Sequence, residues 1–100
     1  MIREVETGHP FGRGRAFRDD ERELQALVSD EVDALGRRYQ HVSVSGRGKL
    51  PTHRAAARFV HALRAKGYVD HEPRTEYTSQ INPYVRHFVP SRLLHRPSDV

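Results

Sequence analysis

A change of hydrophobic period in the middle of the chain constrains its fold more than any other feature. Polar and β-branched residues alternate over His41–Ser45, which is the pattern of a half-buried strand. After a loop with glycine and proline, apolar residues return at helical spacing from residue 53 to residue 66. Thr52 precedes this segment as a good N-cap, and Gly67 follows it at the usual C-terminal position. A strand followed by a helix predicts an α/β domain.

The segment before the strand also has a helical period. Apolar residues recur at steps of three and four over residues 20–38, and Asp20 and Glu23 have the spacing of a capping box. The opposite side of this segment is acidic, which makes it a poor surface for phosphate. We therefore predict a helix over residues 20–38. Its predicted buried positions are Leu24, Leu27, Val28, Val32 and Leu35.

Further strands are predicted toward the C-terminus, at residues 68–72, 75–81 and 84–89, with a turn at Asn82-Pro83. Residues 1–18 are interrupted by glycine and proline and carry several arginines, which predicts a flexible basic arm. Residues 91–100 are predicted to form a loose tail.

Together these elements predict an α/β fold in which two helices pack on one face of a small mixed or antiparallel sheet. We expect one domain at residues 19–90, with the arm before it and the tail after it. A winged helix is the competing fold, because residues 55–69 resemble a recognition helix that runs into a wing. The loop at residues 46–51 is too short to contain the helix that should come before it.

Arginine dominates the charge of the chain. There are 17 Lys and Arg, 15 of them Arg, against 13 Asp and Glu, which gives a net charge of +4. Because the guanidinium group pairs with phosphate and stacks on bases, this composition favours a polyanionic partner. An arginine-rich coding bias in an ordinary domain is the alternative. Only 36% of residues are hydrophobic, so the core is expected to be small.

No pattern of catalytic or metal-ligating residues is evident. The chain has no cysteine, and its seven histidines form no His-x-x-x-His pair. No serine stands in a nucleophile elbow. We therefore expect no catalytic site, no metal and no cofactor. The longest apolar stretches are too short for a membrane span or a secretory signal, so we expect a cytoplasmic protein without membrane contact.

The strongest candidate site is the loop Gly46-Arg47-Gly48-Lys49, which runs into the predicted helix. Glycine lets a ligand approach the backbone, the two cations attract an anion, and a helix N-terminus offers free N–H groups. These features suit a phosphate group, although the spacing is neither that of a P-loop nor that of a dinucleotide fingerprint. A simple turn between strand and helix is the alternative interpretation.

The helix after the loop continues the positive charge. Arg54, Arg58 and His61 recur on one side of it, which is either a phosphate-binding surface or a solvated face. Among the aromatic residues, Tyr39, Phe59 and Tyr68 fall on apolar faces and are predicted core residues. The others are predicted to stack on bases if single-stranded nucleic acid binds. These residues are Tyr77, Tyr84 and Phe88.

The segment from Val42 to Gly67, a strand, a Gly-Arg-Gly-Lys turn and an alanine-rich helix, resembles the Alba family of nucleic-acid-binding proteins. The resemblance covers about a quarter of the chain. It implies that Gly46, Arg47, Gly48 and Lys49 contact nucleic acid. The N-terminal residues depart from the family, which begins with a strand and a lysine-bearing turn.

Non-enzymatic binding of DNA or RNA through phosphate contacts is therefore the leading hypothesis. The candidate contact residues are Arg13, Arg15, Arg18, Gly46, Arg47, Gly48, Lys49, Arg54 and Arg58. The alternative is a structural or adaptor subunit of a larger assembly, such as a virion or accessory component, in which the chain binds other proteins or copies of itself. A ribonuclease with a histidine acid–base pair is the third hypothesis.

Overall fold

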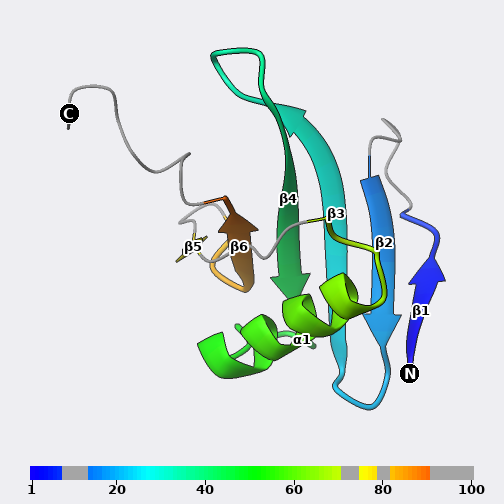
Figure 1. The fold of residues 1–100 in the computed structure, drawn as a ribbon. Coiled ribbons are helices and arrows are strands. Elements are labelled where there is room, and N and C mark those ends of the chain that lie inside the picture. The colour runs from blue at the N-terminus through cyan, green and yellow to red at the C-terminus, as the bar shows by residue number, and fades with distance from the viewer. Residues whose placement is uncertain (8–13, 71–74, 79–81, 91–100) are drawn as a thin grey trace.

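The computed structural model describes residues 1–7, 14–70, 75–78 and 82–90. In this part of the chain, six antiparallel strands form one sheet in the order β1-β2-β3-β4-β6-β5, and a helix lies against one of its faces (Figure 1). The strands are β1 Ile2–Val5, β2 Gly14–Asp19, β3 Leu24–Val32, β4 Arg38–Ser45, β5 Thr75–Thr78 and β6 Val85–Val89, and the helix is α1 His53–Ala65. The predicted fold of two helices on a sheet is therefore wrong.

The predicted helix at residues 20–38 is the main error. Its residues form β3, a turn and the start of β4, which pair as an antiparallel hairpin. Leu24, Ala26 and Val28 alternate and are buried, whereas Val32 is 62% exposed and Leu35 is 76% exposed. The apolar residues fit both the period of a strand and that of a helix. Pairing with β2 and β4 stabilises the strand.

The turn of this hairpin is organised by Asp33. Its Oδ1 accepts hydrogen bonds from the backbone N–H groups of Leu35 and Arg37, both at 2.9 Å. Gly36 has a φ of 77°, which a residue with a side chain rarely adopts. An Asx-type turn with a left-handed glycine is a strong signal for reversal of the chain, and here it lies inside the segment predicted to be helical.

The predicted N-terminal arm is also wrong for the residues that the structure describes. β1 pairs with β2, and β2 pairs with β3 along six residues of each strand. Ile2 and Phe17 are buried in the core. Residues 8–13, which include the predicted contact Arg13, lie outside the described residues, as does the predicted tail at residues 91–100.

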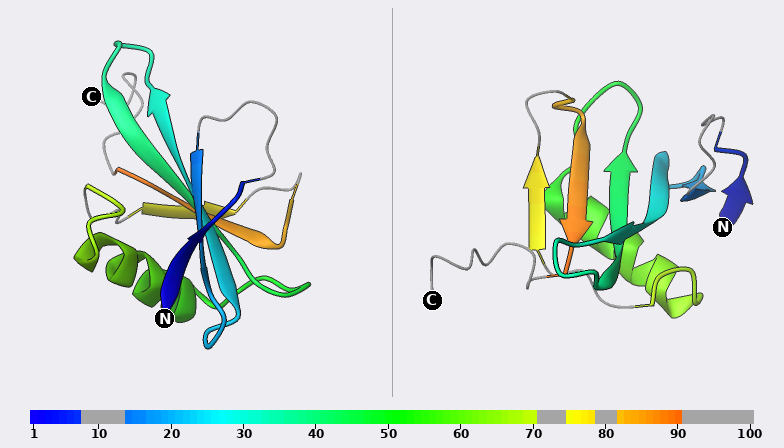
Figure 2. Two further views of the ribbon diagram at one scale, coloured as in Figure 1. Left: turned by 90° about the vertical axis from the view of Figure 1, so that its right-hand side faces the viewer. Right: turned by 90° about the horizontal axis from the view of Figure 1, so that it is seen from above.

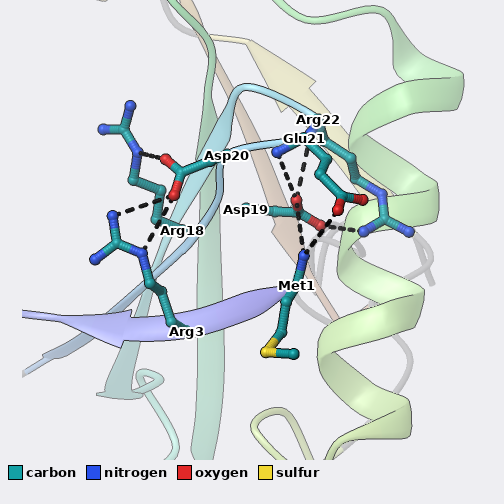
Figure 3. A network of polar contacts seen from close by, with 7 residues as sticks. All are labelled: Met1, Arg3, Arg18, Asp19, Asp20, Glu21 and Arg22. Atoms are coloured by element: carbon teal, nitrogen blue, oxygen red, sulfur yellow. Dashed lines mark hydrogen bonds and ion pairs between the residues drawn. The ribbon is translucent and has the colours of Figure 1, made fainter.

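A buried carboxylate closes the turn between β2 and β3 (Figure 3). The Asp19 side chain is fully buried, and its Oδ1 accepts hydrogen bonds from the backbone N–H groups of Glu21 and Arg22 at 3.0 and 3.3 Å. Its Oδ2 pairs with the Arg22 guanidinium, and the amine of Met1 lies 3.6 Å from Oδ1. Asp19, which directly precedes the predicted capping box, therefore caps a hairpin turn.

The helix after the glycine loop is confirmed. Thr52 Oγ1 accepts a hydrogen bond from the Ala55 N–H at 3.1 Å, and Gly67 has a φ of 80° just beyond the C-terminus of α1. The buried residues of α1 are Ala56, Phe59, Val60 and Leu63, as predicted. Within the described residues, no helix is long and apolar enough to cross a membrane.

The predicted strands agree with the structure in part. Residues 41–45 belong to β4, and the predictions at 75–81 and 84–89 correspond to the shorter β5 and β6. Residues 68–70 form a bend rather than a strand, and residues 71–72 and 79–81 lie outside the described part.

The two faces of the sheet differ in what covers them (Figure 2). On one face, Val42, Val44 and Phe88 pack with Phe59 and Leu63 of α1 in the core. Because successive strand residues point to opposite faces, the residues between them face the other way. No described helix packs on that opposite face, which we call the open face.

Candidate nucleic-acid interface

The loop from Gly46 to Pro51 joins β4 to α1 and needs its glycines for its own geometry. A Cβ on Gly46 would lie 3.1 Å from the Lys49 carbonyl oxygen, and Gly48 has a φ of 71°. The Arg86 guanidinium donates a hydrogen bond to the Pro51 carbonyl and so ties the loop to β6. The glycines are therefore explained by the turn alone, which agrees with the simpler interpretation of this motif.

The cations of the loop and helix are exposed. Lys49, Arg54 and Arg58 have exposed side chains, and within the described part of the chain no ion pair or hydrogen bond holds them. Arg47 is exposed too, with its Nη1 3.5 Å from Glu23 Oε1. Arg54 and Arg58 lie one helical turn apart on α1, so they project on the same side. These groups are available to an external anion.

Charge is strongly segregated along the chain. Residues 34–69 contain eight Lys and Arg and no Asp or Glu, and they include the loop and all of α1. The rest of the chain has nine Lys and Arg against 13 Asp and Glu. The positive charge that remains after internal neutralisation is therefore concentrated on the loop and the helix.

Two of the arginines predicted to contact nucleic acid, Arg15 and Arg18, are described and are engaged within the protein. Arg15 donates to both carboxylate oxygens of Glu4, at 3.0 and 2.8 Å, and this hydrogen bonding lowers the pKa of the Glu4 carboxyl. The Arg15 guanidinium also lies over the stacked rings of Phe17 and Tyr68. Arg18 donates to Asp20 Oδ1 at 2.7 Å (Figure 3). Both arginines have structural partners that phosphate would have to displace.

A second cluster lies on the open face, and the sequence analysis did not identify it. His41 Nε2 and His87 Nδ1 are 2.9 Å apart, and Ser43 Oγ lies 3.3 Å from His87 Nδ1. The Tyr77 ring stacks on His87, with centroids 4.8 Å apart and planes 15° apart. We call His41, Ser43, Tyr77 and His87 the open-face cluster.

The environment keeps both histidines of the cluster neutral. Burial lowers the pKa of His41, and the nearby His87 lowers it further, while Glu31 acts in the opposite direction. Burial also lowers the pKa of His87. At neutral pH each imidazole therefore has one donor and one acceptor nitrogen, which is what a hydrogen bond between two rings requires.

Strand alternation is the signal that points to this cluster. His41 and Ser43 lie two residues apart on β4, and His87 lies opposite Ser43 on β6. Tyr77 lies opposite His87 on β5. The alternation within each strand can be read from the sequence, but the pairing of β4 with β6 joins residues more than 40 positions apart. Of the other predicted stacking residues, Tyr84 is 55% exposed, and Phe88 is buried in the core.

A hollow of about 490 Å³ at the far end of the β3–β4 hairpin is acidic. It is lined by Asp30, Glu31, Val32, Arg38, Tyr39, Gln40 and Asp70. Three carboxylates against one arginine make this a poor site for nucleic acid.

No family model, curated protein or solved structure matches this chain. The resemblance to the Alba family therefore stays a prediction.

Proposed function

We propose that this protein binds nucleic acid without catalysis, through phosphate contacts made by the β4–α1 loop and the exposed side of α1. The contact residues are Arg47, Lys49, Arg54 and Arg58. One observation carries the proposal: six cations and no carboxylate occupy residues 46–66, while most described arginines elsewhere are paired with acidic side chains.

The physical reason is the release of counterions. A phosphate backbone carries a dense row of negative charge, so an unpaired guanidinium or ammonium that meets it displaces condensed cations. A cation that is already paired with a carboxylate contributes less binding free energy, because it must first give up that partner. Within the described residues, the surface of the loop and α1 is therefore expected to bind a polyanion most strongly.

The test is a titration against random DNA and RNA over a range of salt concentrations, with the variant Arg54→Glu/Arg58→Glu. We expect the variant to bind all sequences more weakly and to flatten the slope of log K against log salt by about one unit per lost contact. A glutamate in the first turn of α1 suits the helix dipole, so the fold should persist.

The matched control is Arg3→Glu/Arg37→Glu. It makes the same change in net charge on β1 and on the hairpin turn, where both arginines pair with aspartates. We expect the control to keep the salt slope of the parent chain. Absence of binding by the parent chain at low salt, where attraction is strongest, would overturn the proposal.

A second candidate function is that of an adaptor in a larger assembly, and one observation favours it. The tip of the β3–β4 hairpin exposes Val32 and Leu35 well away from α1 (Figure 1). Exposed apolar side chains at a projecting tip are typical of a protein contact. In that case Val32→Ser/Leu35→Ser would abolish association with a protein partner, and the Arg54→Glu/Arg58→Glu variant would not.

A further inference from the structure

We propose that the open face binds unpaired nucleobases, with Tyr77, His87 and His41 as a stacking platform, so that the preferred ligand is a single strand. This inference rests on the proposed function and adds to it the form of nucleic acid that is recognised. Three properties of the rings support it: their geometry, their chemistry and their position relative to the phosphate-binding loop.

The rings form one stacked group in nearly parallel planes rather than a collection of separate side chains. A hydrogen bond between two imidazole nitrogens is directed in the plane of each ring, and the planes of His41 and His87 differ by only 22°. The two imidazoles therefore lie edge to edge, with centroids 5.0 Å apart. Tyr77 lies nearly parallel to both, at 15° from His87 and 7° from His41.

This surface is open to a ligand. Tyr77 is 40% exposed and lies on β5, the edge strand of the sheet, while both histidines are half-buried. Any of the nucleobases can stack on an aromatic ring, because every base has a π-face. The neutral imidazoles and the Ser43 hydroxyl supply donors and acceptors at the rim, which suit the polar edge of an unpaired base.

The chain itself connects the platform to the phosphate-binding loop. β4 carries His41 and Ser43, and it continues directly into the loop with Arg47 and Lys49. Ser43 lies two residues before the end of β4 at Ser45, and Arg47 lies two residues after that end. A single strand that follows β4 can place its bases on the open face and its phosphates at the loop. A duplex cannot do this, because its bases are paired and stacked inside.

A metal ion is the other ligand that two histidines suggest, and the structure favours it less. Among the described residues, no group of three metal-ligating side chains lies together. The stacked tyrosine contributes nothing to a metal site, whereas it is central to a stacking platform.

The test compares a single-stranded oligonucleotide with a duplex of the same length and salt, using the variant Tyr77→Ala. We expect Tyr77→Ala to weaken single-strand binding about 5- to 100-fold, as expected for the loss of one stacking contact. Duplex binding should change less than about twofold. Tyr77→Phe keeps the ring and should restore single-strand affinity, which separates stacking from loss of folding.

Tyr84→Ala is the matched control, because Tyr84 is an exposed tyrosine outside the cluster. It should leave both affinities unchanged. If Tyr77→Ala binds the single strand like the parent chain while Arg54→Glu/Arg58→Glu binds it weakly, the stacking inference is wrong and the proposed function stands. If the parent chain binds neither ligand, both are wrong.

Discussion

The two faces of the sheet are built from the same strands and have opposite chemistry. In β4, Val42 and Val44 enter the core beneath α1, while His41 and Ser43, which alternate with them, face outward. In β6, Phe88 is buried and its neighbour His87 joins the open-face cluster. The covered face therefore supplies stability, and the open face holds an ordered polar and aromatic cluster that the core does not need. A covered face and an open polar face are common in antiparallel sheets, and the stacking proposal assigns the open face of this sheet to a ligand.

The largest expected effect of a substitution is on the covered face. Phe59 is fully buried in the core, so Phe59→Ala should lower the free energy of unfolding by about 3–5 kcal/mol. On the open face, Tyr77→Ala should cost about 1 kcal/mol, because it removes one ring stack from an exposed edge strand. Urea unfolding of both variants measures the difference. Equal losses would contradict the division of roles between the faces.

A smaller effect is expected from pH, and it tests the open face alone. The pKa values of His41 and His87 are lowered in the folded protein, so below about pH 6.5 the unfolded chain binds protons that the folded chain does not. Stability should therefore be full above pH 6.5 and fall as the pH drops toward the folded pKa values. Urea unfolding between pH 7 and pH 5 measures this loss.

The double variant His41→Gln/His87→Gln should flatten this dependence. Tyr84→Ala is the control, since Tyr84 is exposed and its replacement keeps the histidine pair, and this variant should keep the dependence of the parent chain. A double variant whose stability still falls as steeply between pH 7 and pH 5 would show that the pair is not responsible.

Local signals in the sequence predicted the elements that local chemistry determines. Thr52 and Gly67 delimit α1 by capping and left-handed geometry, and both roles are confirmed. The apolar residues around Leu24 fitted two periods, and the strands that pair with this segment lie elsewhere in the chain, so the hydrophobic pattern alone could not decide. The Asx turn at Asp33 was the clue that favoured a hairpin.

The candidate site, too, could be predicted from the sequence only where local signals determine it. The positive charge of the loop and α1 can be counted from the sequence, and its exposure follows from the helical period. The open-face cluster depends on the order β4-β6-β5, which brings Tyr77 and His87 beside His41 and Ser43. Because these strands are separated in the sequence by α1, scattered histidines gave no sign that they would meet.

The most direct test of the account is a map of amide chemical shifts in the ¹⁵N-labelled chain on addition of a short single-stranded oligonucleotide at low salt. We expect the shifts to concentrate at residues 46–49, on the exposed side of α1 around Arg54 and Arg58, and at His41, Tyr77 and His87. The hairpin turn at residues 33–37 should be unaffected. Shifts confined to that turn, or no shifts at all, would contradict the claim that the basic loop and the open face together bind nucleic acid.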